Sequence, residues 1–160
     1  MGQVVVVEIP GQDWVELSFR QKVDSKVDLN VDPNIGILAP SKTSFWHLRL
    51  IGCSEVILLG QALKSQLHLN PQQWTLPTGG SHGAILFREL ILKARGEWNL
   101  PYKEQEICHC RKIPRSLVEG QISTGVFSVT EITRRTQAGA GCGTCRRDIQ
   151  QLIDYKIPKI

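Results

Sequence analysis

The sequence predicts an α+β fold in two parts: an antiparallel sheet followed by helices over residues 1–102, and a small all-helical module over residues 103–160. Alternating apolar residues dominate the region before Gly52, which is typical of half-buried strands. From Gly52-Cys53-Ser54 onward the apolar residues recur at helical spacing. Four of the five cysteines then stand in two close pairs near the C-terminus, with helical patterns between them.

Four strand patterns open the chain. A β-branched run predicts a buried strand at residues 4–9, and Pro10-Gly11 predicts a turn after it. Alternating patterns follow at residues 14–20, 27–31 and 45–51. Because turn residues separate these segments, we expect an antiparallel meander.

Three helices are predicted next. After Ser54, which stands where a helix cap is expected, helical spacing places four apolar side chains on one face: Val56, Leu59, Leu63 and Leu67. Asn70-Pro71 is a cap followed by a proline at the first helical position, which predicts a short helix through Trp74. Ser81 can cap a longer helix with three apolar residues on its inner face, namely Leu86, Leu90 and Ala94. Residues 99–103 form the predicted joint to the second part.

Composition excludes several classes of protein. Hydrophobic residues make up 41% and charged residues 21% of the 160 positions, as in a globular rather than a disordered protein. No apolar run is long enough to cross a membrane, and the N-terminus lacks the basic segment of a secretory signal. We therefore expect a cytoplasmic protein that does not act at a membrane.

The cysteine pairs predict a metal centre. Cys108-His109-Cys110 and Cys142-Gly143-Thr144-Cys145 are separated by 31 residues, numbers 111–141. Two such pairs, folded together, supply the four soft sulfur ligands that zinc or an iron–sulfur cluster needs. Two disulfides are a weaker alternative, because thiols stay reduced in the cytosol. We interpret His109 as a spacer that points away from the metal.

The segment between the pairs favours their convergence. Four apolar residues fall near helical spacing before Gly125: Ile113, Leu117, Val118 and Ile122. Ser128 and Glu131 have the spacing of a capping box, which predicts a second helix through Thr136. Residues 138–141 form a small-residue turn, and the second cysteine pair opens a third helix with an apolar face of Ile149, Leu152 and Ile153.

Both pairs, their separation and the approach to the second pair resemble the bacterioferritin-associated-ferredoxin-type (BFD-like) [2Fe-2S] domain. This domain also forms the central part of the nitrogen-fixation scaffold NifU. The resemblance covers residues 104–155 and includes the stretch Thr-Gln-Ala-Gly-Ala-Gly-Cys-Gly-Thr-Cys at 136–145. It implies that one [2Fe-2S] cluster is held by four ligands: Cys108, Cys110, Cys142 and Cys145. A structural zinc ion on the same four thiolates is the alternative.

The positive charge is concentrated in the second part. Residues 1–102 carry nine basic and nine acidic side chains, whereas residues 103–160 carry ten and six. Four of the cations directly flank the cysteine pairs: Arg111, Lys112, Arg146 and Arg147. An oxidised [2Fe-2S] centre with four thiolates is negative, so we interpret these cations as compensating its charge or steering an acidic redox partner. We prefer this interpretation to nucleic-acid binding.

The first part resembles the IscU-like scaffold domain that begins NifU proteins, in the order of strands, Gly52-Cys53, helix, Leu76-Pro77, His82 and helix. Gly83 stands where that family has its third cysteine, and no Cys-Gly-Asp lies on the earlier strands. The resemblance therefore implies a degenerate domain without the three-thiol assembly site. By itself, Cys53 is typical of a small buried hydrophobic residue. A thiolate there with His82 beside it would bind metal or attack a persulfide donor.

The sequence thus predicts a two-domain [2Fe-2S] protein acting in electron transfer or in iron–sulfur cluster assembly and delivery. It shows no nucleotide loop, paired-carboxylate site or nucleophile–base constellation, so we expect no enzymatic activity of its own. The expected partner is a redox protein or an apo iron–sulfur protein, and the oligomeric state is left open, with a homodimer among the options. The alternative function is a structural zinc module with an attached protein-interaction domain.

Overall fold

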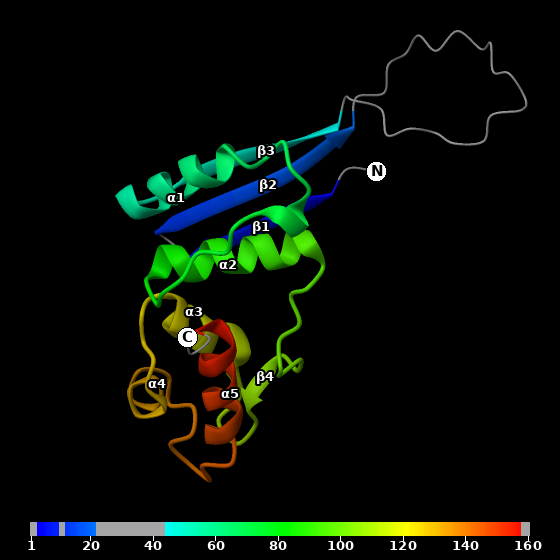
Figure 1. The fold of residues 1–160 in the computed structure, drawn as a ribbon. Helices are drawn as coiled ribbons and strands as arrows, with labels where there is room; N and C mark the ends of the chain where they lie inside the picture. Colours follow the sequence, from blue (N-terminus) through cyan, green and yellow to red (C-terminus); the bar gives the residue numbers. More distant parts are fainter. Residues whose placement is uncertain (1–2, 10–11, 22–43, 158–160) are drawn as a thin grey trace, which may run out of the picture.

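The computed structural model describes residues 3–9, 12–21 and 44–157 (Figure 1). The predicted strand at 27–31 and the predicted turn at 10–11 lie outside these ranges. No helix within them is long and apolar enough to cross a membrane. The elements follow in this order: β1 (Val4–Ile9), β2 (Asp13–Gln21), β3 (Ser44–Ile51), α1 (Ser54–Lys64), the 3₁₀ helix η1 (Pro71–Gln73), α2 (His82–Arg95), β4 (Glu106–Cys108), β5 (Ile113–Pro114), α3 (Arg115–Ser123), α4 (Val129–Thr136) and α5 (Arg146–Lys156).

The first part is a three-stranded sheet covered on one face by two helices. The strands run in the order β1-β2-β3 and both pairs are antiparallel, with Leu17 of β2 opposite Leu48 of β3. Val15 and Leu17 point toward α1 and α2 and are fully buried. The opposite face carries exposed apolar side chains such as Phe45 and Ile51. The predicted antiparallel sheet followed by helices is therefore confirmed.

Two of the three helix caps predicted for the first part are formed. The Ser81 side chain accepts a hydrogen bond from the Ala84 N–H at 3.4 Å, and the Asn70 side chain accepts one from the Gln72 N–H at 3.1 Å. The prediction for Ser54 is wrong, because Ser54 is already the first residue of α1 and Cys53 occupies the N-cap position without a side-chain cap bond. Helix α1 therefore begins directly after Cys53, without a side-chain cap.

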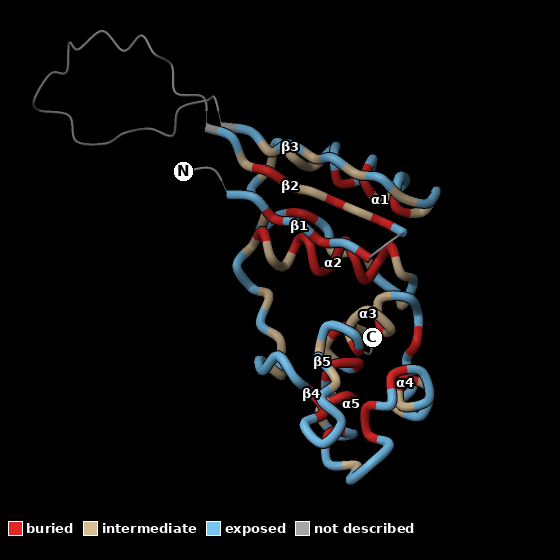
Figure 2. The backbone as a smooth tube through the Cα atoms, turned by 180° about the vertical axis from the view of Figure 1, so that it is seen from behind, coloured by how far each residue is buried: buried red, intermediate tan, exposed pale blue. Residues whose placement is uncertain are grey.

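Helix α2 lies between the sheet and the helices of the second part (Figure 1). Residues 83–91 are all buried, which Figure 2 shows as a continuous buried stretch. The sheet covers the face with Leu86 and Leu90, as the spacing predicts. On the other side the Arg88 guanidinium donates to the Lys156 backbone oxygen at 2.8 Å, and Glu89 accepts from Lys156 Nζ at 3.1 Å. These contacts join the two parts of the chain.

The second part packs α3, α4 and α5 around its own hydrophobic cluster, which runs from Ile107 to Ile153. The prediction that it is entirely helical is wrong, since β4 and β5 form a small antiparallel hairpin before α3. Buried Ile107 lies in β4, and Lys112 has a positive φ of 52° in the turn between the strands. Whether the chain divides into independent domains at residue 102 stays a prediction.

Candidate metal centre

Two thiol pairs far apart in the sequence meet at one place in the second part. Cys110 Sγ lies 3.7 Å from Cys108 Sγ and 3.6 Å from Cys142 Sγ. The thiols of Cys108 and Cys145 also share a hydrogen bond. The convergence expected from the spacing is therefore present in the structure, while the role of each cysteine as a ligand stays a prediction.

The β4–β5 hairpin positions the first pair. Cys108 ends β4, and its backbone oxygen accepts the Arg111 N–H at 3.3 Å, so that the chain turns directly at Cys110. The adjacent Ile107 is anchored in the hydrophobic cluster with 1% exposure. One thiol is thus fixed against the core, and its neighbour in the turn reaches the surface.

A glycine-rich turn between α4 and α5 positions the second pair. Gly139 and Gly143 have positive φ values of 80° and 78°, which glycine adopts without a steric cost. At Gly141 a Cβ atom would lie 3.3 Å from Cys110 Sγ, so this backbone passes close to the opposing thiol. Cys145 then occupies the N-cap position of α5. The predicted small-residue turn and the predicted helix after the second pair are both confirmed.

Each pair combines one buried and one exposed thiol. Cys108 and Cys145 are buried, with 1% and 7% exposure, whereas Cys110 and Cys142 are exposed. None of the four forms a disulfide. The site therefore has an inner side anchored in the core and an outer side open to solvent.

The thiols of the centre differ in their pKa values. Burial opposes ionisation of Cys108, but hydrogen bonds from the Gly139 backbone and the Cys145 thiol hold its pKa below the ordinary value. The hydrogen bond from the Thr144 hydroxyl lowers the pKa of Cys142 to about 7. Burial and the hydrogen bond with Cys108 raise the pKa of Cys145 to about 11. Crowded sulfurs of this kind ionise together only when positive charge lies between them, which iron or zinc supplies.

His109 faces away from the thiols. Its Nε2 lies 3.2 Å from a Glu104 carboxylate oxygen, its Nδ1 lies 3.9 Å from Glu106, and its side chain is 65% exposed. These contacts agree with its interpretation as a spacer. Of the flanking cations, Arg146 donates from Nε to the Gly139 backbone oxygen at 3.0 Å and so braces the turn before the second pair.

A family model identifies this part of the chain. Residues 106–155 match the BFD-like [2Fe-2S] binding domain. The match contains both cysteine pairs of the BFD-like domain and confirms the resemblance read from the sequence. Neither a curated protein nor a solved structure matches the chain. The resemblance of residues 1–102 to the IscU-like domain of NifU stays a prediction.

The donor set of the BFD-like domain fits its cofactor. Four thiols within hydrogen-bonding reach of their neighbours offer only sulfur, which suits a [2Fe-2S] cluster, and the matched family binds this cluster. The backbone at Gly141 passes close to Cys110 Sγ. Because glycine has no side chain, it does not obstruct the exposed thiols. The cofactor of this domain is thus a [2Fe-2S] cluster.

A second group of polar side chains lies in the first part of the chain. Cys53 Sγ is 3.1 Å from His82 Nε2, which itself is 3.4 Å from a carboxylate oxygen of Asp13. A Cys53 thiolate with His82 beside it was one of the two interpretations that the sequence left open. The interpretation of Cys53 as a buried hydrophobic residue is wrong, because at the N-cap of α1 it is exposed. Sequence reasoning did not identify Asp13, whose only signal is its position at the start of a strand.

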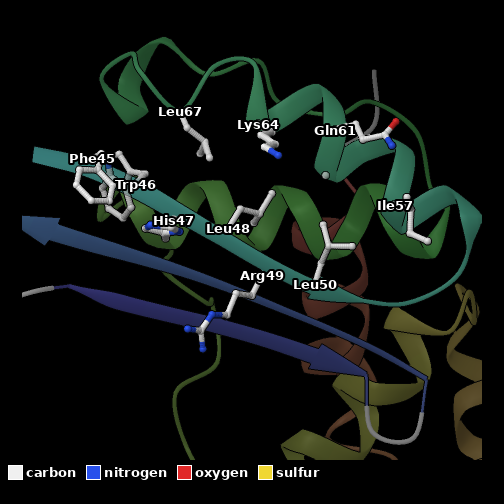
Figure 3. A pocket seen from close by; sticks show the side chains of 11 residues that line it. Phe45, Trp46, His47, Leu48, Arg49, Leu50, Ile57, Gln61, Lys64 and Leu67 are labelled. Carbon is white, nitrogen blue, oxygen red and sulfur yellow. The ribbon is translucent and has the colours of Figure 1, made fainter.

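A pocket of about 660 Å³ opens between β3 and α1 (Figure 3). Its walls include Trp46 and Leu48 of β3 and Ile57 and Lys64 of α1. None of the five cysteines lines it. Its apolar walls and scattered cations carry no constellation of catalytic groups, so we assign no catalytic function to it.

Proposed function

We propose that this protein carries single electrons to or from a partner protein through a [2Fe-2S] cluster ligated by Cys108, Cys110, Cys142 and Cys145. A [2Fe-2S] cluster accepts and releases one electron at a time. The observation that carries the proposal is the division between buried Cys108 and Cys145 and exposed Cys110 and Cys142. The buried pair holds the centre in the core, and the exposed pair brings its edge to the surface where a partner can approach.

Exposed cations around this edge suit an acidic partner. Arg111, Lys112 and Arg147 are exposed and lie next to the cysteines in the sequence. Cations near a negative centre stabilise its reduced form, and they also steer an oppositely charged protein toward it. In this proposal the protein is a carrier that works with a partner and catalyses no reaction alone.

Cluster delivery to an apo iron–sulfur protein is the second candidate. The same exposed thiols, Cys110 and Cys142, leave one side of the centre open to thiolates of an acceptor. The resemblance to NifU, a scaffold for cluster assembly, supports this candidate. Incubation with an apo-ferredoxin, followed by circular dichroism of the acceptor, separates the two. A clean redox couple without transfer supports the carrier, and rapid transfer supports delivery.

Anaerobic purification with iron, sulfide, zinc and visible absorption measurements tests the cofactor, and a redox titration tests the carrier role. We expect two iron and two sulfide per chain, which is the composition of one cluster. We also expect a reversible one-electron couple above the value of about −400 mV typical of plant-type ferredoxins, because of the neighbouring cations. A colourless, redox-silent protein that contains zinc would instead establish the structural zinc module.

A further inference from the structure

We propose that the pocket beside β3 binds an extended, acidic segment of a partner protein, which adds to the sheet as a further strand. β3 pairs with β2 along one side, and no strand in the described ranges pairs with its other side. The backbone N–H and C=O groups of such an edge can pair with another chain. No residue of the BFD-like domain lines this pocket, so the inference does not depend on the function proposed above.

The pocket follows the edge of β3 rather than one of its faces. Its wall includes six consecutive residues of the strand, numbers 45–50. Successive side chains of a strand point to opposite faces of a sheet, so a cavity on one face would be lined by every second residue. Contact with all six therefore places the cavity along the edge of the strand. Six residues offer an edge of about 20 Å, which accepts an extended segment of about the same number of residues.

Helix α1 forms the opposite wall of this groove (Figure 3). Four residues of the helix line it: Ile57, Gly60, Gln61 and Lys64. Their spacing of i, i+3, i+4 and i+7 places them on one face of the helix. Gly60 allows the helix to approach the strand, because a Cβ atom there would collide with Leu50 Cδ2. An added strand gains affinity from backbone hydrogen bonds to β3 and specificity from alternate side chains that face α1.

The two sides of β3 select an alternating segment. On the helix side, Leu48 and Leu50 line the groove and pack against the core cluster. On the outer side, His47 and Arg49 are exposed. An added strand continues the pleat of the sheet, and its side chains pair with those of the neighbouring strand on the same face. Apolar residues of the segment therefore face α1, and acidic residues between them lie beside Arg49.

The charge of the groove favours an acidic partner over a second copy of this chain. Arg49 and Lys64 line it, whereas none of the described residues in its wall is an aspartate or a glutamate. Glu16 of β2 stands opposite Arg49 in the register but does not line the pocket. Pairing of β3 with β3 of a second copy would add the same cations to the groove, and like charges on paired strands are unfavourable. Carboxylates of an acidic segment pair with both cations.

The binding test uses the full chain with its cluster and a fluorescein-labelled peptide of alternating valine and glutamate, followed by fluorescence anisotropy. We expect saturable binding of one peptide per chain, which weakens as salt is added because exposed charges are screened. A peptide with the same valines and glutamates in two separate blocks should bind at least about 10-fold more weakly, since its side chains do not match the pleat. No binding of the alternating peptide, or equal binding of both peptides, would overturn the proposal.

Residue-resolved hydrogen exchange tests whether the peptide adds as a strand. The bound peptide should slow exchange at alternate amides of residues 45–51, which are those that point away from β2, by at least about 10-fold. Binding without this protection would overturn strand addition. Protection that appears without peptide and grows with protein concentration, together with a doubled mass in sedimentation, would assign the edge to a second copy instead.

Variants test the role of the cations. Arg49→Glu and Lys64→Glu should each weaken peptide binding by at least about 10-fold, because a repulsion replaces an attraction. Lys103→Glu is the matched control, since it makes the same change of charge at an exposed lysine outside the groove and should bind like the wild type. Cluster absorbance and far-ultraviolet circular dichroism report whether each variant folds. Wild-type binding by both folded groove variants, or an equal loss in Lys103→Glu, would contradict the assignment.

Discussion

Cys110 and Cys53 are both exposed thiols, yet their neighbours give them different roles. Cys110 lies within 3.7 Å of two other sulfurs, whereas Cys53 faces His82. We therefore predict that Cys110→Ser loses most of the cluster and destabilises the second part of the chain, because the free energy of cluster binding there contributes to folding. Cys53→Ser should keep the visible absorption. Iron per chain and absorbance of anaerobically purified protein measure both effects.

Two results would contradict these roles. Bleaching by Cys53→Ser would place the cluster in the first part of the chain. Full iron content in Cys110→Ser would remove Cys110 from the ligand set and leave the convergence with Cys108 and Cys142 without a function.

The residues of the metal centre and of the group around Cys53 were not equally predictable from the sequence. The four thiols of the BFD-like domain stand two and three positions apart within pairs, so their spacing alone predicts a common metal centre. Asp13 is 40 residues from Cys53 and follows a turn in a chain with other turn aspartates. Only the pairing of β2 with β3, which ends beside Gly52-Cys53, brings the carboxylate to the thiol. Long-range pairing of this kind leaves no local pattern.

At the scale of single elements, α4 shows how a local motif is overridden. Ser128 occupies its N-cap position, but the side chain makes no cap bond, so the predicted capping box is wrong. The carboxylate of Glu131 instead accepts hydrogen bonds from Arg134 at 2.7 Å and Arg135 at 2.7 Å. These bonds lower the pKa of Glu131 to about 2. Two charged donors outcompete a single backbone N–H for the same carboxylate.

Ser81 forms a cap bond and Ser128 does not, so replacing each by alanine gives a matched pair of variants. Ser81→Ala removes a cap that accepts the Ala84 N–H and should lower the free energy of unfolding by about 1 kcal/mol. Ser128→Ala removes a side chain without a cap bond and should cost no more than about 0.5 kcal/mol. Urea unfolding followed by circular dichroism measures both. A larger cost for Ser128→Ala than for Ser81→Ala would reverse the assignment of the caps.

The type of an element was predicted correctly where its sequence pattern is long, and the prediction failed where the pattern is short. The strand at residues 45–51 and the helix after Ser81 both agree with the structure. The β4–β5 hairpin was missed because its strands have three and two residues, too few to show alternation. Helix α2 was expected to bury one face, but Arg88 and Glu89 are buried too, because the second part covers them. A polar residue buried by a distant segment cannot be identified from its own helix.

At the scale of the whole molecule, α5 connects the cluster site to the first part of the chain. Cys145 is at its N-terminal end and Lys156 at its C-terminal end. Lys156 is buried, and its Nζ contacts Glu89 of α2 at 3.1 Å and Glu119 of α3 at 3.5 Å. The last turn of α5 also presents the Tyr155 hydroxyl, which accepts the Asn99 N–H at 2.8 Å. Order at the cluster site and order at this junction are therefore expected to depend on one another through a single helix.

The ion pair between Lys156 and Glu89 predicts a pH-dependent junction. Burial opposes the charge of Glu89, but Lys156 and Lys93 hold its pKa below the ordinary 4.5. Because this pKa is lower in the folded state, its contribution to stability is present above pH 4.5 and is lost as the pH falls through the folded value. Glu89→Gln, which leaves the buried Lys156 with a weaker partner, should lower the free energy of unfolding at pH 7 by about 3 kcal/mol. The difference from the wild type should shrink below pH 4.5.

Lys93→Gln is the control for this prediction. Lys93 pairs with the same carboxylate at 2.8 Å, but its side chain is 33% exposed, so its loss should cost less than about 1 kcal/mol. Urea unfolding followed by tryptophan fluorescence reports on the junction, because the Trp98 ring lies 5.7 Å from Lys156 Nζ. Equal costs for Glu89→Gln and Lys93→Gln, or a cost of Glu89→Gln that is unchanged at low pH, would show that the buried pair does not hold α5 against α2.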